Sequence, residues 1–251
     1  MSSGSSAPAA AAHGWSRERL RAAVDRHRGT TRTAGPTALD SRVGAVFAHG
    51  TDGDHFCTAS VVDSPGRNLV VTAAHCLVEP RLGRTRSDLV FAPGYRDGDT
   101  PSGVWPLDAV TVDPSWRRSG NQDLDVAFAT VRPQDGRQVQ EVLGGNRLGT
   151  DRGHRLEVKV TGYPSSADRP ITCSTTTTEQ SPTQLRIDCP GYTGGTSGSP
   201  WVTDLDPRTR TGTVVGVIGG YQEGGDTADT SYSSYFGEQV RALYQQASGS
   251  P

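Results

Sequence analysis

Residues 194–200 of the chain read Gly194-Gly195-Thr196-Ser197-Gly198-Ser199-Pro200. Glycines on both sides of Ser197 favour a sharply bent backbone that exposes a hydroxyl beside free N–H groups, because glycine adopts positive φ without a Cβ clash. Runs of Gly, Ser and Thr are more often plain loops, so this stretch alone does not establish a functional site.

Two stretches upstream of Ser197 change that interpretation. Thr72-Ala73-Ala74-His75-Cys76 comes first, and Asp123-Leu124-Asp125-Val126-Ala127-Phe128 follows it before the serine is reached. The chain order His, Asp, Ser is one of three known orders for a triad that carries out acyl transfer. The three stretches together therefore predict a nucleophilic serine with its base and its orienting carboxylate.

A family resemblance rests on Cys57-Thr58-Ala59-Ser60 and on the segment from Leu69 to Cys76. These residues closely resemble the trypsin-like (chymotrypsin-fold) serine proteases, on the bacterial branch that includes the glutamyl endopeptidases. The resemblance extends over residues 42–247, but most members have Asp before the serine and Gly-Gly-Pro after it. This chain has Thr196 before the serine and Gly-Ser-Pro after it.

The resemblance implies an all-β fold of two antiparallel six-stranded β-barrels packed together, with a C-terminal α-helix. Short β-rich runs separated by Gly, Asp and Pro agree with it. The runs are Val43–Ala48, Thr58–Val62, Leu69–Thr72, Asp88–Ala92, Trp105–Val112, Val126–Val131, Leu156–Gly162, Gln184–Asp188, Pro200–Asp204, Thr213–Ile218 and Tyr232–Phe236.

Three parts of the chain are expected. Residues 1–41 form an N-terminal extension, partly disordered, in which residues 15–24 are either a short amphipathic helix or a solvated arm, and residues 29–40 a linker. Residues 42–133 form the first barrel with His75 and Asp125, and residues 134–248 the second barrel with Ser197. A helix is expected over 238–247, because Val240, Leu243, Tyr244 and Ala247 recur at i, i+3, i+4 and i+7.

The composition fits a turn-rich β protein and argues against two classes of partner. The chain of 251 residues is 33% hydrophobic and contains 31 Gly and 16 Pro. Its formal net charge is −2, its basic residues are spread along the chain, and no apolar run approaches the length of about 18 residues that a membrane helix needs. We therefore expect no nucleic-acid partner and no membrane partner, and we expect a monomer that acts on a peptide or protein substrate.

The four cysteines, Cys57, Cys76, Cys173 and Cys189, allow three disulfide connectivities. The family resemblance implies the pair Cys57–Cys76, which leaves Cys173–Cys189. Neither pair has Cys-x-x-Cys spacing and no His-x-x-x-His accompanies them, so we expect no metal. The acyl-enzyme chemistry that the resemblance implies needs no cofactor, so we expect none. Disulfides indicate an oxidising compartment and hence a secreted, extracellular protein. Met1 to Ser6 lack the charged start and apolar core of a secretory leader, so we expect this sequence to be the matured form.

The candidate triad assigns a role to each member. Ser197 is the nucleophile, and His75 is the base, since an unperturbed imidazole titrates near neutrality. Two carboxylates stand two residues apart, and alternation would place them on the same face. We favour Asp125, which directly precedes an apolar run, over Asp123, which follows Asn121-Gln122 in a turn context. The other histidines, His13, His27, His49, His55 and His154, receive no role.

The resemblance also implies an oxyanion hole and a substrate pocket. The oxyanion hole is formed by the backbone N–H groups of Gly195 and Ser197. Gly191 occupies the place where tryptic relatives have Asp, and Ile218 the place where glutamyl relatives have His, although Thr193 matches the latter. Gly219, Gly220 and Tyr221 are expected to pair with an extended substrate backbone. Without a charged partner in the pocket, a neutral residue is predicted before the cleaved bond.

Three functions remain open from the sequence. The first is a secreted serine endopeptidase that works through an acyl-enzyme. The second is a pseudoprotease, a binding protein that keeps the fold without the chemistry. The third is an esterase, but the usual Gly-x-Ser-x-Gly elbow opens a helix between parallel strands, and no alternation of helices and strands is visible here.

Overall fold

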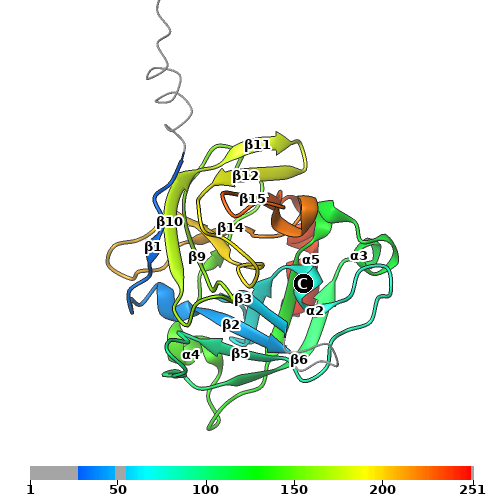
Figure 1. Cartoon of the computed structure of the whole chain (residues 1–251). Coiled ribbons are helices and arrows are strands. Elements are labelled where there is room, and N and C mark those ends of the chain that lie inside the picture. The colour runs from blue at the N-terminus through cyan, green and yellow to red at the C-terminus, as the bar shows by residue number, and fades with distance from the viewer. Residues whose placement is uncertain (1–27, 49–54, 250–251) are drawn as a thin grey trace, which may run out of the picture.

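The computed structural model describes residues 28–48 and 55–249. Two β-rich halves pack against each other, and the C-terminal helix α5 (Glu238–Ser248) lies beside the first half (Figure 1). The all-β prediction is confirmed. Residues 15–24, for which a short amphipathic helix and a solvated arm were both open, lie outside the described residues. None of the described helices is long and apolar enough to cross a membrane.

The first half is a closed six-stranded barrel, as predicted. Its strands follow one another around the barrel in the order β2-β3-β4-β7-β6-β5, and closure leaves no free sheet edge. The strands are β2 (Val43–Ala48), β3 (His55–Val62), β4 (Leu69–Thr72), β5 (Val90–Pro93), β6 (Trp105–Val112) and β7 (Ala127–Val131).

The strands of the second half form two separate sheets rather than one continuous hydrogen-bonded sheet. A six-stranded sheet has the order β1-β10-β9-β13-β14-β8, and a three-stranded sheet has the order β11-β12-β15. The strands are β1 (Arg32–Thr33), β8 (Arg147–Leu148), β9 (Glu157–Gly162), β10 (Ile171–Thr176), β11 (Thr178–Ser181), β12 (Gln184–Asp188), β13 (Pro200–Thr203), β14 (Thr213–Val217) and β15 (Thr230–Ser234). Strands β1, β8, β10 and β11 were not predicted, since polar Thr, Ser, Arg and Gln residues dominate them.

One apolar cluster joins the two halves. It contains buried side chains of the first barrel such as Leu69 and Phe128, together with Val202 and Val217 of the second half. Helix α5 adds Val240 and Leu243, the positions predicted to face the core. Burying each such side chain stabilises the fold by about 1.5–3 kcal/mol relative to exposure, so this cluster fixes the two halves against each other.

Short helices and turns complete the fold. Helix α3 (Pro114–Ser119) is capped by Asp113, whose side chain accepts a hydrogen bond of 2.7 Å from the N–H of Ser115, and Gly120 ends it with φ 65°. The other helices of the described residues are α2 (Ala74–Leu77) and α4 (Val139–Leu143), and their 3-10 turns are η2 (Asp40–Arg42), η3 (Gln122–Leu124) and η4 (Tyr221–Gly224).

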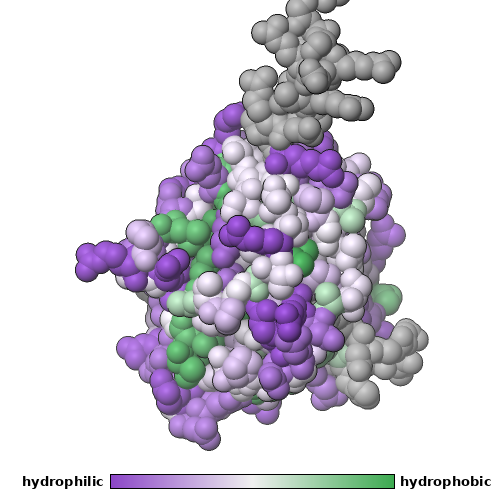
Figure 2. Space-filling view, turned by 60° about the vertical axis from the view of Figure 1, so that its left-hand side comes forward, coloured by the Kyte–Doolittle hydropathy of each residue, from purple (hydrophilic) through white to green (hydrophobic). Residues whose placement is uncertain are grey.

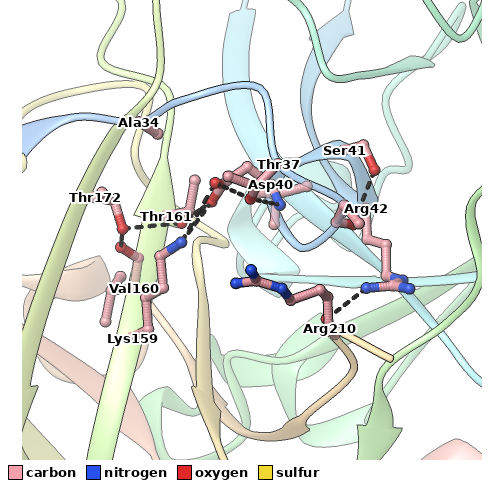
Figure 3. Close-up of polar contacts among 12 residues, drawn as sticks. Ala34, Thr37, Asp40, Ser41, Arg42, Lys159, Val160, Thr161, Thr172 and Arg210 are labelled. Atoms are coloured by element: carbon pink, nitrogen blue, oxygen red, sulfur yellow. Dashed lines mark hydrogen bonds and ion pairs between the residues drawn. The ribbon is translucent and has the colours of Figure 1, made fainter. Parts of the chain in front are cut away.

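The segment 28–41, which belongs to the predicted N-terminal extension with its linker, is attached to the second half. Strand β1 pairs with β10, and Asp40 is buried. The Asp40 carboxylate receives hydrogen bonds from the ammonium group of Lys159 at 3.0 Å and from the Thr161 hydroxyl at 2.9 Å (Figure 3). A buried carboxylate needs such partners, and they belong to β9, more than a hundred residues away.

Two disulfides have the pairing that the sequence analysis expected. Cys57 is joined to Cys76 and Cys173 to Cys189. The first ties β3 to the helix that carries His75, and the second ties β10 to the residue that follows β12. Each closes a loop of 16–19 residues, which stabilises the fold by about 3 kcal/mol in the chain-entropy model.

The surface in view is mainly polar. Figure 2 shows strongly hydrophilic side chains around the edge of this face and side chains of intermediate hydropathy over much of its middle, with apolar patches toward the left. The large apolar side chains that are exposed on the described residues lie far apart in the sequence: Leu82, Val104, Val142, Leu205 and Tyr221.

Candidate active site

The register of two barrel strands brings His75 and Asp125 together. Strands β4 and β7 are antiparallel neighbours, and Thr72 stands opposite Ala127. His75 lies three residues after Thr72, and Asp125 lies two residues before Ala127, so both extend beyond the same end of this strand pair. Nδ1 of His75 is 2.8 Å from Oδ2 of Asp125, and the backbone N–H of His75 donates to Oδ1 at 2.9 Å.

The Asp125 carboxylate is completely buried and receives a further hydrogen bond. The N–H of Gly220 donates to Oδ2 across 2.9 Å. Three donors from two halves of the molecule therefore hold this carboxylate in one orientation. A carboxylate in this position keeps one imidazole nitrogen protonated and the opposite nitrogen, Nε2, available as a base.

The pKa of His75 is raised above its ordinary value of 6.5. Burial of the ring acts in the opposite direction, because it disfavours the charged form, but the negative charge and the hydrogen bond of Asp125 outweigh it. The charge of Glu223 raises the pKa further, and that of Arg86 lowers it. Imidazolium formation at His75 is therefore favoured by its surroundings.

Asp123 points to a different part of the molecule. Its Oδ1 accepts hydrogen bonds from the Thr183 hydroxyl and the Gln184 amide, each at 2.9 Å. Alternation along a strand does not apply to Asp123 and Asp125, because residues 122–124 form the 3-10 turn η3. The structure therefore pairs Asp125, and not Asp123, with His75.

Ser197 lies on the loop that precedes β13, next to the first barrel. The N–H of Thr58 in β3 donates to the Ser197 carbonyl at 2.8 Å. A Cβ at Gly198 would lie 2.1 Å from both the Thr58 carbonyl and the Thr72 hydroxyl, so only glycine fits there. No hydrogen bond of the Ser197 hydroxyl, to His75 or to any other group, is recorded among the described residues.

The expected oxyanion-hole amides lie on the same bend. Gly195 has φ +93° and Gly198 has φ +83°, which L-residues with a side chain rarely adopt. Within the described part of the chain, no acceptor is recorded for the N–H groups of Gly195 and Ser197. Free N–H groups of this kind bind developing negative charge on a carbonyl oxygen.

The residues expected to bind substrate are placed around this bend. Gly191 and Thr193 are exposed, whereas Ile218 is buried and its N–H donates to the Ser199 carbonyl at 3.0 Å. Tyr221 is 41% exposed and packs edge-on against Tyr232, with ring centroids 5.1 Å apart.

The amides of Gly219 and Gly220 have partners inside the protein. The N–H of Gly219 donates to the Tyr232 carbonyl at 3.0 Å, and that of Gly220 to Asp125. A substrate backbone that pairs with this segment would therefore meet carbonyl groups rather than these two N–H groups.

Sequence reasoning missed two contributors to the site. The first contributor is the N–H of Gly220, which donates to Asp125. It was missed because the resemblance assigned this segment to substrate binding. The second contributor is the Thr58 hydroxyl, which donates to the Gly195 carbonyl at 3.0 Å. Its position directly after Cys57, in the most specific motif of the sequence, could have pointed to a role in the site.

One group of potential metal ligands occurs in the described ranges 28–48 and 55–249. Ligand atoms of Cys57, His75 and Cys76 lie within 4.8 Å of one another. The two sulfurs are joined in a disulfide, so they are not the thiolates that bind metals. This donor set therefore does not suit a metal ion.

Comparisons with known proteins agree with this geometry. The trypsin-like peptidase domain, as a sequence family, matches residues 57–217. No curated protein sequence matches the chain.

Several solved protease structures have a similar fold. The protease Anisep from Arthrobacter nicotinovorans is 26% identical with a TM-score of 0.76, and the alignment covers 87% of this chain and 99% of that one. The thermostable serine protease AL20 from an extremophilic microorganism is 27% identical with a TM-score of 0.77, covering 86% and 100%. A Glu endopeptidase in complex with MPD is 15% identical with a TM-score of 0.69, covering 88% and 97%, and this likeness concerns the fold alone.

Proposed function

The chain belongs to the family of trypsin-like peptidase domains and is a serine endopeptidase, and we propose that it cleaves peptide bonds with Ser197, His75 and Asp125 as a catalytic triad. The observation that carries the proposal is the buried His75–Asp125 pair, with Nδ1 and Oδ2 2.8 Å apart, beside the bend that contains Ser197.

The proposed reaction begins with attack of the Ser197 hydroxyl on the substrate carbonyl carbon. The hydroxyl proton passes to Nε2 of His75 as the new C–O bond forms. Asp125 keeps the imidazole oriented and stabilises its cation. The N–H groups of Gly195 and Ser197 bind the negative charge that develops on the carbonyl oxygen, and losing one such donor typically raises the barrier by about 3–4 kcal/mol.

Collapse of this intermediate breaks the C–N bond. His75 returns its proton to the leaving amine, and the acyl group remains as an ester on Ser197. A water molecule then attacks the ester while His75 accepts its proton, and the same proton restores the Ser197 hydroxyl as the acid product leaves.

The proposed substrate has a neutral residue before the cleaved bond. Gly191 and Ile218 provide no charge where charged pockets of relatives have Asp or His, and a charged side chain buried without a partner is unfavourable. The exposed ring of Tyr221 stands beside this region and either contacts an apolar residue or narrows the pocket for small ones. A peptide library with cleavage sites read by mass spectrometry tests this; strong preference for Glu, Arg or Lys would contradict it.

The proposed location is extracellular. Two disulfides link all four cysteines, and structural disulfides persist mainly in oxidising compartments. Fractionation of the source cells with an antibody against the chain would check this, and recovery of the protein only from the reduced cell interior would refute it.

Two rival functions are separated by one labelling experiment and one substrate comparison. A triad enzyme should react with an alkyl fluorophosphonate at one site per chain, and Ser197→Ala should abolish the labelling. A pseudoprotease would show no labelling and no hydrolysis of a peptide amide. An esterase would label but would hydrolyse esters while leaving peptide amides intact.

A further inference from the structure

The bend that presents the Gly195 and Ser197 N–H groups is held by its carbonyl groups. The Thr193 carbonyl accepts from the N–H and the hydroxyl of Thr196, at 3.1 and 2.7 Å, and the Gly194 carbonyl accepts from the N–H of Ser165 at 2.8 Å. The Thr196 carbonyl accepts from the N–H and the hydroxyl of Ser199, at 3.0 and 2.6 Å. Contacts within the second half of the molecule therefore hold these three carbonyl groups.

The other two carbonyl groups of the bend are held from the first barrel by one residue, Thr58. The Thr58 hydroxyl donates to the Gly195 carbonyl at 3.0 Å, and the Thr58 N–H donates to the Ser197 carbonyl at 2.8 Å. The same hydroxyl accepts a hydrogen bond of 3.0 Å from the N–H of Tyr163. Thr58 is completely buried, so water cannot replace these contacts.

Peptide planarity connects these carbonyls to the two free N–H groups. Within one peptide unit, C=O and N–H point in opposite directions and rotate together. The peptide between Gly195 and Thr196 lies between the two units whose N–H groups face the substrate. Its carbonyl is bound by Thr58 and its N–H by the Thr193 carbonyl, so neither of its polar groups is free to turn.

We propose that the Thr58 side chain is a positioning residue for the oxyanion hole, because its hydroxyl fixes the peptide unit that separates the two donors. The inference rests on the proposed function, since it assigns Gly195 and Ser197 that role. Thr196 carries no charge, so the ion pair that an aspartate could form at this place is replaced by neutral hydrogen bonds from the first barrel.

The side chain at position 58 therefore needs a hydroxyl and not only a suitable shape. Valine has nearly the same volume, but it would remove the hydroxyl that donates to the Gly195 carbonyl and accepts from the Tyr163 N–H. Serine keeps the hydroxyl and loses only a methyl group. A buried carbonyl group without a hydrogen-bond donor is unfavourable. Rotation of the Gly195–Thr196 peptide would let this carbonyl find another donor, but it would also turn the neighbouring N–H groups of Gly195 and Ser197 away from the substrate oxygen.

The test compares Thr58→Val, Thr58→Ser and the control Thr172→Val on a peptide amide substrate. Thr172 is also buried, and its hydroxyl donates to the Val160 carbonyl at 3.0 Å, away from the bend. Deleting a complete oxyanion donor lowers kcat about 10²- to 10³-fold, so a misoriented one should lower it about 10- to 100-fold. We expect that fall for Thr58→Val with little change in KM.

Further readouts separate positioning from general destabilisation. Thr58→Ser should recover most of kcat, and Thr172→Val should lower Tm comparably to Thr58→Val while keeping kcat. The rate of phosphonylation by an alkyl fluorophosphonate should fall with kcat in Thr58→Val, because the phosphoryl oxygen also occupies the oxyanion hole. The acidic limb of the pH profile should not move.

Equal kcat for Thr58→Val and wild type, or an equal loss in Thr172→Val, would overturn the inference while leaving the proposed function intact. Should Thr58→Val not fold, Thr58→Cys compared with Thr58→Ser decides the matter, since the two side chains have a similar shape and a thiol is the weaker donor, and an equal kcat in the two refutes the positioning role. Wild-type protein that neither cleaves peptides nor labels at Ser197 would instead refute the proposed function itself.

Discussion

The backbone N–H of Gly220 lies 2.9 Å from Oδ2 of Asp125 and donates a hydrogen bond to it. Gly220 has φ +79°, and a Cβ there would lie 2.8 Å from the backbone nitrogen of Ser234, so glycine is required at this position. The two residues are 95 positions apart and belong to different halves of the molecule. The orientation of the carboxylate that holds His75 therefore depends on how the two halves pack.

Asp125→Asn should lower kcat by about 10³- to 10⁴-fold, because an amide stabilises the wrong imidazole tautomer. Asp123→Asn should keep most of the activity, since Asp123 binds Thr183 and Gln184 and not His75. Both variants should be measured on the same peptide amide. The reverse ordering of the two losses would transfer the orienting role to Asp123.

Ser197→Ala and His75→Ala should each abolish peptidase activity, and the double variant should be no worse than either single one. The members of a triad act as one unit, so their losses, about 10⁶-fold in kcat, do not add. Circular dichroism and Tm should show an intact fold in all three. Substantial activity in either single variant would contradict the triad assignment.

The raised pKa of His75 predicts where activity falls on the acidic side of the pH profile, and it predicts that stability depends on pH. kcat/KM should decline as the pH falls through a value above 6.5, because protonated His75 cannot act as a base. The interaction of imidazolium with Asp125 stabilises the fold fully below about pH 6.5, and this contribution is lost as the pH rises through the folded-state pKa.

Both effects are measurable in the same protein. NMR titration of His75 in Ser197→Ala, which prevents self-cleavage, reports the folded pKa. Unfolding free energies of Ser197→Ala with and without His75→Gln, compared from pH 5.5 to 8.5, should converge as the pH rises. A folded pKa below 6.5 would show that burial outweighs Asp125.

Full-length protein should be active with the bond between Arg42 and Val43 intact. Thr196 has no charge with which to bind a newly formed N-terminal ammonium group. Arg42 is 6% exposed, and its guanidinium donates to the Arg210 carbonyl at 2.6 Å (Figure 3). Trypsin should therefore not cut after Arg42 in the native protein.

Intact-mass spectrometry of an active, labelled sample tests this prediction directly. Inert full-length protein that becomes active only after cleavage near Arg42 would contradict it.

Lys159→Met should destabilise the fold by about 2–3 kcal/mol, because it leaves the buried Asp40 carboxylate with hydroxyl partners only. This expected loss of stability is smaller than the usual cost of breaking a buried ion pair, because the Lys159 side chain is 19% exposed and solvent screens its charge. Chemical denaturation in the Ser197→Ala background measures the change. Arg132→Met, which removes an exposed ion pair with Asp108, is the control and should change stability by less than about 1 kcal/mol.

Most strands could be predicted from the sequence where apolar residues recur in short runs. Val43–Ala48, Leu69–Thr72 and Trp105–Val112 were predicted with the bounds that the structure has. Strands β1 and β11 could not be, because their residues are polar and exposed or half-buried. Only pairing makes them extended, β1 with the distant strand β10 and β11 with its neighbour β12. The first barrel closes as predicted, whereas the pairing of the second half into two sheets depends on contacts that no local pattern contains.

The sequence by itself determined the residue types of the site and their order, since the motifs around His75, Asp125 and Ser197 are local. It also determined the helix face of Val240 and Leu243, because periodicity is a local property. The local context of Asp125 also favoured it over Asp123 as the partner of His75, and their contact depends on the tertiary structure. Tertiary structure alone decided that Gly220 orients Asp125, and that Thr58 and Asp40 bind groups far along the chain. Each of these depends on hydrogen bonds between segments about 50 to 140 residues apart, and such partners are specified by strand register and packing rather than by neighbouring residues.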